Sequence, residues 1–505
     1  MKINNFQGWL GQKGNAVALI AGAILPLAFS PFDFFPVAVI SLLLLFLSWH
    51  NVATKTAAWR GFLFGLGMFG VGVSWVYVAI HDFGHANVLL ASLLTALFVS
   101  FLSLYIAALA VLIKRLTGTI FSSLDLILLL PVSWLGFEWF KSWFLTGFPW
   151  LELGISQIAG PLAGYTPVIG VLGVSWLVAL SAGLLAASYL FSRWWLLMPV
   201  IVIWLAGSLL QQNIWTSPKD EPIRVSLIQG NIPQDIKWSP EQLFKTLALY
   251  QARTEQNWQS DLIVWPENAV TVFHHQAKDY FLDPLAKLAR DNDTDILVGL
   301  PVKQDNSRNY FNSMMVLGSE EAFYHKRHLV PFGDYMPLEW LRGLIDFFNL
   351  PMSSFIAGEP RQALLHAAGQ DIGVSICYED TFSNEVLMTV PEASILVNAT
   401  NNAWYGDSFA PHQHLQISRN RALEMGRPVV RATTNGISAL IDFNGELKQQ
   451  TAQFEEAVLT GMVQARQGET PYVTWGRRPM LFMALFMLMV WAYYRRTNHQ
   501  QAISR

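Results

Sequence analysis

The sequence predicts a membrane protein of two parts, a multi-pass α-helical domain and an α+β domain outside the bilayer. Of its 505 residues, 52% are hydrophobic and 14% are charged, and the mean hydropathy is +0.33. An average soluble domain has about 25% charged residues. The long apolar runs lie between residues 15 and 210, whereas residues 211–478 have the composition of an ordinary soluble protein. This uneven distribution indicates two domains.

Eight apolar stretches are candidate membrane spans, because a helix needs about 20 residues to cross the hydrocarbon core. They lie at 15–29, 36–48, 61–80, 88–113, 124–140, 169–190, 195–210 and 479–494. No small-residue cleavage site follows the first stretch and further spans come at once, so we interpret it as an uncleaved anchor. We expect a seven-helix membrane domain at 1–210, an extracytoplasmic domain at 211–478, and a last helix with a tail at 479–505.

Basic residues predict the orientation, since Lys and Arg are enriched in cytoplasmic loops. If the helices alternate, one side holds Lys2, Lys13, Lys55, Arg60, Lys114, Arg115, Arg193, Arg495 and Arg496. The opposite loops hold Lys141 alone, apart from Arg477 and Arg478 beside the last span. We therefore expect both termini in the cytoplasm and residues 211–478 on the other side. The formal net charge of −3 gives no indication of nucleic-acid binding.

Short β-branched runs in the second domain alternate with amphipathic stretches, which is typical of an α/β or α+β domain. The predicted strands are 223–229, 262–265, 295–300, 312–318, 372–377, 394–399, 429–433 and 437–441. A helix is expected after Ser239, which is a candidate cap with Gln242 three positions later.

Three reactive side chains follow separate apolar runs of this domain. Glu267 comes after Pro266, which ends a strand; Lys326 borders another run; Cys377, the only cysteine, ends a third. Each alone has an ordinary explanation: a solvated acid, part of a basic surface, or a small buried hydrophobe. Together at the ends of strands, an acid, an amine and a thiol form a candidate catalytic set.

These residues lie in motifs that resemble the nitrilase superfamily, whose catalytic residues are Glu, Lys and Cys in that chain order. The motifs are WPEN (265–268), KRHLVPFGD (326–334) and CYE (377–379). Five longer motifs make the chain similar, over nearly its whole length, to the apolipoprotein N-acyltransferases of bacterial envelopes. They are TGFPWLELG (146–154), QGNIPQDIKW (229–238), NATNNAWYGDS (398–408), RALEMGRPVVRATTNGIS (421–438) and TPYVTWG (470–476).

The resemblance implies a nitrilase-type αββα sandwich on an eight-helix domain of the bacterial inner membrane, facing the periplasm. It also implies the last step of lipoprotein maturation, without metal or other cofactor. An acyl chain would pass from a glycerophospholipid, typically phosphatidylethanolamine, to Cys377 and then to the α-amine of a diacylglyceryl-cysteine at the start of an apolipoprotein. Glu267 would act as the base, and Lys326 would stabilise thiolate and oxyanion.

The resemblance assigns further residues by position. Glu379 matches an acid that supports the catalytic set, although an acid at a strand end also suits contact with water. Asp334 stands where the family has Glu, and its shorter chain puts a direct catalytic role in question. The remaining matches line the site, its loops or the lipid entrance, or are ordinary packing, turn or interfacial residues: Tyr378, Asn312, Trp238, Arg342, Gly147 and Trp150.

Three other functions are possible for these residues: hydrolysis, transport and metal binding. A membrane-anchored nitrilase-type amidase or hydrolase would share the catalytic set, but eight spans are more than an anchor needs. A transporter would need charges within the spans, and Asp125 and Glu138 are too few and too peripheral. A metal site is not indicated, because His325, His328, His412 and His414 lack a convincing ligand set.

Overall fold

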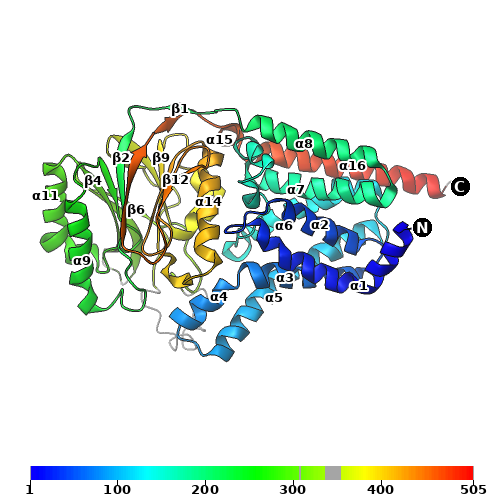
Figure 1. The fold of residues 1–505 in the computed structure, drawn as a ribbon, viewed down its shortest axis with the longest axis horizontal. Coiled ribbons are helices and arrows are strands. Elements are labelled where there is room, and N and C mark those ends of the chain that lie inside the picture. The colour runs from blue at the N-terminus through cyan, green and yellow to red at the C-terminus, as the bar shows by residue number, and fades with distance from the viewer. Residues whose placement is uncertain (1, 306, 308, 336–353, 504–505) are drawn as a thin grey trace. The chain divides into compact units, whose positions relative to one another are not determined.

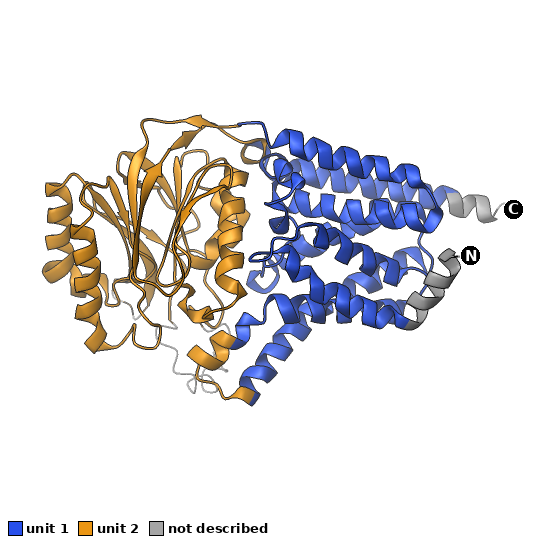
Figure 2. Cartoon of the chain, viewed as in Figure 1, with its two compact units in different colours: residues 1–77, 89–214, 474–505 blue, residues 78–88, 215–473 orange. Residues whose placement is uncertain are grey.

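The computed structural model describes the chain except residues 1, 306, 308, 336–353 and 504–505, and describes only the backbone of residues 2–12 and 498–503. The chain divides into two compact units (Figure 2). The first comprises residues 1–77, 89–214 and 474–505, and the second comprises residues 78–88 and 215–473.

The first unit is helical. Its helices are α1 (Lys2–Ile24), α2 (Pro36–Trp49), α3 (Thr54–Gly72), α4 (Trp75–Val78), α5 (Val88–Thr117), α6 (Leu130–Lys141), α7 (Thr166–Phe191), α8 (Leu197–Leu210) and α16 (Arg478–Ile503). Helices α1 and α3 pack closely through glycine: a Cβ atom on Gly22 would lie 2.0 Å from the carbonyl oxygen of Phe64. Such small residues let the backbones of membrane helices approach each other.

Among the described residues, two helices are long and apolar enough to cross a membrane, Val88–Thr117 and Pro161–Phe191. The pair Thr54–Gly72 and Trp75–Phe83 is bent by 55° and would be a third if it forms one span. Three shorter apolar helices, Lys13–Ala28, Pro36–Trp49 and Trp194–Leu210, coincide with predicted spans. The multiple apolar helices agree with the prediction, but the number of eight spans is not confirmed.

The bend has a structural consequence. Residues 78–88, which follow it and contain a π-helical turn (Ala79–Phe83), belong to the second unit. There the ring of Phe83 lies 6.2 Å from that of Trp404. The predicted loop between two spans is therefore part of the same compact unit as the α+β domain.

The second unit contains two six-stranded sheets with the orders β13-β2-β3-β4-β5-β6 and β12-β11-β10-β9-β8-β7. The strands of the first are β2 (Ile223–Gln229), β3 (Leu262–Val264), β4 (Asp295–Lys303), β5 (Tyr310–Leu317), β6 (Ala322–His325) and β13 (Ala457–Val463). The strands of the second are β7 (Leu365–Ala367), β8 (Gln370–Ile376), β9 (Ile395–Thr400), β10 (Val429–Thr433), β11 (Ala439–Ile441) and β12 (Leu447–Gln450). A small sheet pairs β1 (Ser217–Pro218) with β14 (Arg466–Gln467).

Three apolar cores hold four layers together. One core lies between the sheets and includes Val264 and Val397. Another lies between the first sheet and its helices and includes Ile263 and Leu285. The last lies between the second sheet and its helices and includes Leu396 and Leu415. The covering helices are α9 (Pro240–Glu255), α10 (His274–Ala277) and α11 (Asp283–Asp291) on one side, and α13 (Ser383–Leu387) and α14 (Phe409–Met425) on the other. Figure 1 shows α9 and α11 on the outer side of one sheet and α14 beside the other.

The predicted α+β domain and its αββα layers are thus confirmed, and each predicted strand overlaps an observed one. The prediction for Ser239 was only half right. Ser239 occupies the N-cap position of α9 with extended backbone, but its side chain makes no capping hydrogen bond.

Candidate active site

The three candidate catalytic residues lie directly beyond strand ends and are all buried. Glu267 follows β3, Lys326 follows β6, and Cys377 follows β8. The first two strands belong to one sheet and the third to the other, and the sheets pack face to face through a shared core. The exposed fractions of Glu267, Lys326 and Cys377 are 6%, 1% and 8%. The two sheets therefore bring residues from distant parts of the chain into one buried cluster, in which the charges of Glu267 and Lys326 act on Cys377.

Lys326 forms ion pairs with two carboxylates in this cluster. Its Nζ lies 2.7 Å from Asp334 Oδ2 and 3.5 Å from Glu267 Oε1. Burial lowers the pKa of Lys326, but Asp334, Glu267 and Cys377 outweigh it and raise that pKa well above its usual value. The amine is therefore held as an ammonium. Although Asp334 is one methylene shorter than the family's Glu, its carboxylate reaches Lys326.

Glu267 is held by two further donors. Its Oε1 accepts a hydrogen bond from Asn312 Nδ2 at 2.7 Å, and its Oε2 accepts one from the backbone N–H of Asn401 at 2.8 Å. Asn312, which the resemblance placed near the site, thus contacts the candidate base directly. Both carboxylate oxygens have fixed directions, which holds the group in place.

The backbone of Cys377 has left-handed geometry, with φ of +54°, where β8 turns into a 3-10 helix (Cys377–Thr381). This conformation costs a non-glycine residue about 1–2 kcal/mol. The Cys377 carbonyl oxygen accepts hydrogen bonds from Asn398 Nδ2 and His414 Nε2, both at 3.2 Å. These contacts hold the strained turn that presents the thiol.

The pKa of the Cys377 thiol is raised to about 12: burial and the negative charge of Glu267 raise it and outweigh Lys326 and a hydrogen bond with Thr400, which lower it. The resting thiol is therefore protonated. A protonated thiol is a poor nucleophile, so its reaction requires a base. The arrangement has the groups for acyl transfer through sulfur: a thiol, a carboxylate base and an ammonium.

Glu379 has no exposed surface and is not a solvated acid, so that reading is wrong. Its carboxylate accepts the backbone N–H groups of Ile376, Arg327 and His328 at 2.6, 2.5 and 3.1 Å, and the hydroxyl of Tyr324 at 3.0 Å. It therefore ties the segment after Lys326 to the turn at Cys377. This contact supports the catalytic set by position.

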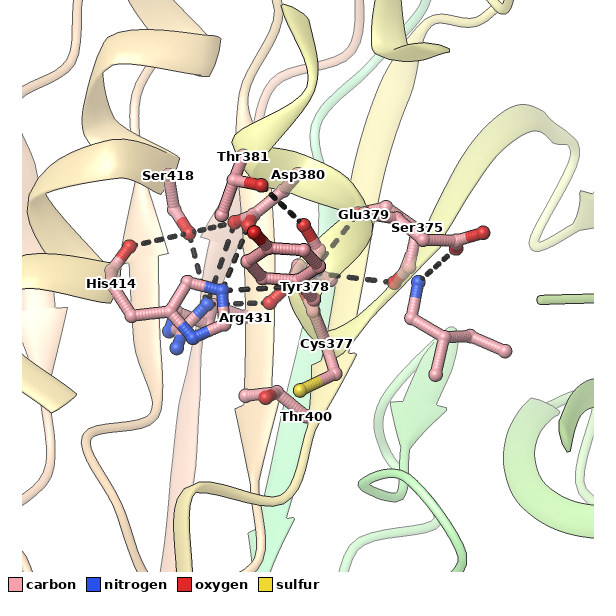
Figure 3. A network of polar contacts seen from close by, with 12 residues as sticks. Ser375, Cys377, Tyr378, Glu379, Asp380, Thr381, Thr400, His414, Ser418 and Arg431 are labelled. Atoms are coloured by element: carbon pink, nitrogen blue, oxygen red, sulfur yellow. Dashed lines mark hydrogen bonds and ion pairs between the residues drawn. The ribbon is translucent and has the colours of Figure 1, made fainter. Parts of the chain in front are cut away.

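A buried network behind Cys377 was not predicted (Figure 3). His414 Nε2 lies 2.8 Å from Asp380 Oδ1, the Ser418 hydroxyl donates to Asp380 Oδ2 at 2.5 Å, and Arg431 lies 3.6 Å from that oxygen. Although burial raises the pKa of Asp380, the contacts with His414, Arg431 and Ser418 lower it overall. In the sequence, the indication of this network was Asp380, the acid that directly follows the CYE motif.

A second unpredicted group is the loop before α9. Lys237 Nζ donates to the backbone carbonyl of Glu267 at 3.1 Å and to Thr434 Oγ1 at 3.4 Å. Gln234 Oε1 accepts from Asn401 Nδ2 at 2.8 Å. The adjacent Trp238, a predicted substrate-binding residue, is half-buried.

The remaining predicted residues are placed as follows. Tyr378 is half-buried, with its ring 5.1 Å from that of Phe382. Gly147 and Trp150 lie in the first unit, where Gly147 has φ of +89° and the Lys141 ammonium donates to the Trp150 carbonyl. Arg342 lies outside the described residues. The substrate-binding roles of these residues stay predictions.

Comparison with known proteins assigns both parts of the chain. Residues 21–184 match the apolipoprotein N-acyltransferase N-terminal domain, and residues 224–472 match the carbon-nitrogen hydrolase domain. A solved CN-hydrolase superfamily protein, XC1258 from Xanthomonas campestris, is 20% identical with a TM-score of 0.37 and covers 52% of this chain and 97% of its own.

Full-length relatives are much more similar. An apolipoprotein N-acyltransferase of Methylococcus capsulatus is 44% identical over 96% of this chain and 97% of its own. One of Azotobacter vinelandii is 42% identical over 97% of each chain. Because this similarity extends through both domains, the chain belongs to the apolipoprotein N-acyltransferase family.

Proposed function

We propose that this protein transfers an acyl chain from a glycerophospholipid to the N-terminal amine of a diacylglyceryl apolipoprotein, through a thioester on Cys377. The buried cluster of Glu267, Lys326 and Cys377 carries this proposal. The protonated thiol of Cys377 has the carboxylate of Glu267 in the same cluster to accept its proton.

In the first half-reaction, Glu267 accepts the proton of the Cys377 thiol while sulfur attacks the ester carbonyl carbon of the phospholipid. The negative charge that develops on the carbonyl oxygen is stabilised by the Lys326 ammonium. The carbon–oxygen bond to glycerol then breaks, and Glu267 returns the proton to the leaving oxygen. The products are a lysophospholipid and an acyl thioester on Cys377.

In the second half-reaction, the α-amine of the apolipoprotein attacks the thioester carbonyl and Glu267 accepts a proton from nitrogen. The carbon–sulfur bond breaks as the amide forms, and the proton returns to sulfur. Asn312 and the N–H of Asn401 keep the carboxylate of Glu267 in place during both steps, while Asp334 holds Lys326. Each lipid substrate occupies the site in turn.

The membrane part of the proposal is an eight-span domain at 1–210 and 479–505 in the bacterial inner membrane, with residues 211–478 as the catalytic domain on the periplasmic side. The bias of basic residues supports this topology. The inclusion of residues 78–88 in the second unit supports it too, because that loop is predicted on the same side as the catalytic domain. We assign lipid entry to Gly147 and Trp150, substrate contacts to Trp238 and Arg342, and a supporting role to Tyr378.

Intact mass measurement of the purified full-length protein tests the proposal. With phosphatidylethanolamine alone, we expect a gain of one acyl chain that hydroxylamine removes. A diacylated lipopeptide with a free α-amine should discharge the thioester and become N-acylated, whereas an N-acetylated lipopeptide should leave it intact. Release of free fatty acid at one rate with or without lipopeptide would favour the hydrolase alternative. Other phospholipid headgroups, compared at equal concentration, test the choice of donor.

A further inference from the structure

Lys237 is a second lysine at the candidate active site. Its side chain is 2% exposed, and its Nζ donates to the backbone carbonyl of Glu267 and to the hydroxyl of Thr434. Glu267, the candidate base, is thus held through its carboxylate by Asn312 and Asn401 and through its backbone by Lys237. Lys237 connects the loop before α9 to the catalytic pocket.

The partners of Lys237 differ from those of Lys326. Lys326 forms ion pairs with Asp334 and Glu267, whereas both hydrogen-bond partners of Lys237 are neutral. Among the described side chains, no carboxylate oxygen lies within 4.0 Å of Lys237 Nζ. A buried charge without an ion-pair partner is costly for a folded protein. Nearby negative charge offsets this cost, both the charge of Glu267 in the resting site and the charge that develops during the reaction.

The charges of the other buried groups also indicate a role for Lys237 in the reaction. Glu267 and Asp334 carry two negative charges and Lys326 carries one positive charge, so these three groups leave one negative charge in excess. This excess opposes a thiolate or an oxyanion at Cys377. Lys237, whose charge is felt by both Glu267 and Cys377, makes the pocket neutral. Tyr405, which also lies within reach of these charges, is uncharged because burial raises its pKa. Arg431, which also acts on Cys377, forms an ion pair with Asp380 and so adds no net charge.

We propose that Lys237 is a charge-balancing and positioning residue for the acyl transfer: its ammonium holds the backbone of Glu267 and offsets the negative charge that develops when Cys377 attacks an ester. This inference rests on the proposed function. It assigns the two lysines different tasks. Lys326 stabilises the reacting groups, and Lys237 sets the overall charge of the pocket.

The proposal has a consequence for pH dependence. Burial lowers the pKa of Lys237 to about 8, against the opposite effects of Glu267 and Cys377. The pKa of Lys326 is raised well above its usual value, so Lys326 stays charged where Lys237 loses its proton. The rate of thioester formation is therefore expected to fall as the pH rises through about 8.

The test measures thioester formation by the full-length protein in detergent with phosphatidylethanolamine alone, by acid quench and intact mass, between pH 6 and 10. Without a lipopeptide, no acceptor amine titrates in this range. We expect Lys237→Met to be slower than wild type by about 10-fold at pH 7 and to lack the decline near pH 8. Lys237→Arg, which stays charged throughout, should retain more activity than Lys237→Met and also lack that decline. Lys245→Met, an exposed lysine on α9, is the matched control.

Several results overturn the inference. One is a Lys237→Met rate within about twofold of wild type at every pH. Another is an equal loss of rate in Lys237→Met and Lys237→Arg, with both variants keeping the wild-type pH profile. A residue that acts only through packing would give this result. If the variants do not fold, as judged by thermal unfolding, a wild-type rate that stays constant from pH 7 to 10 overturns it. Failure of wild type to form any thioester would instead contradict the proposed function.

Discussion

The two sheets of the sandwich contribute to the candidate site in different ways. The first sheet supplies Glu267 and Lys326, side chains of opposite charge that contact each other, and Lys326 also contacts Asp334. The second supplies Cys377, whose strained backbone is held through its carbonyl by Asn398 and His414. The first side thus contributes charge, and the second contributes the conformation of a turn. Substitutions of the charged groups should therefore fail by lost chemistry. On the second side, loss of the Cys377 thiol itself should do the same, whereas substitutions of the groups that support its turn should fail by lost position and stability.

The largest effect is expected from Cys377→Ala. Because the thiol is the proposed nucleophile, the variant should form no thioester and transfer no acyl chain. Alanine keeps the Cβ and removes one buried atom, so the thermal unfolding midpoint should stay within a few degrees of wild type. Intact mass and thermal unfolding in detergent measure both. Appreciable transfer by this variant would remove Cys377 from the mechanism.

Glu267→Gln tests the charged side of the site. The amide preserves the shape and the contact with Asn312, loses the hydrogen bond from the Asn401 N–H, and cannot accept a proton, so thioester formation should slow by about 100-fold or more. The free energy of unfolding should change much less than the rate. Glu392→Gln, an exposed acid of the same domain, serves as the control. A rate near that of wild type would exclude Glu267 as the base.

Glu379→Gln tests the link between the two sides. An amide cannot accept from all the donors around this buried carboxylate, and its NH₂ group would face backbone N–H groups. We expect a loss of about 2 kcal/mol in the free energy of unfolding and a decrease of about 10-fold in thioester formation through misplacement. Denaturation and single-turnover kinetics would measure these. Loss of activity with unchanged stability would instead indicate a direct role in the chemistry.

The smallest effect on rate is expected from Asp380→Asn in the network behind Cys377. At neutral pH thioester formation should change by less than about threefold, because this residue acts through His414. The folded-state pKa of Asp380 is lowered, so its carboxylate contributes stability above its unfolded pKa of about 3.9 and that contribution is lost as the pH falls.

Thermal unfolding from pH 7 down to 3 measures this prediction. Wild type should lose stability below about pH 4, and Asp380→Asn should be less stable at pH 7 but lose less on acidification. Parallel curves for the two proteins would show that Asp380 does not titrate with unfolding.

His414 links the Asp380 network to the backbone of Cys377. Its Nε2 faces two oxygens, Asp380 Oδ1 and the Cys377 carbonyl, whereas its Nδ1 faces the Asn402 amide nitrogen at 3.3 Å. A neutral imidazole with the proton on Nε2 satisfies both sides, and burial, which lowers the pKa of His414, favours the neutral form. The histidine considered as a metal ligand in the sequence therefore serves to hold the backbone of Cys377.

The sequence by itself determined the local features of this protein. β-branched runs predicted the strands that precede Glu267 and Cys377, since a buried strand is encoded in consecutive residues, but β6, which precedes Lys326, was not among the predicted strands. Glu267, Lys326 and Cys377 were recognisable because each stands in a short motif beside such a run. Long apolar stretches predicted the helical first unit, but their length did not reveal the 55° break after α3.

Only the tertiary structure decided which residues meet. Asn401 lies 134 positions from Glu267, and Thr434 lies 197 positions from Lys237, yet these pairs form hydrogen bonds. No periodicity or local motif specifies such contacts, because they depend on how two sheets from separate chain segments pack together. The same packing made Glu379 a buried acceptor rather than a solvated acid, and placed a second lysine beside the proposed base. Residue types and their spacing indicated the chemistry, and the packing of the two sheets set its charge balance.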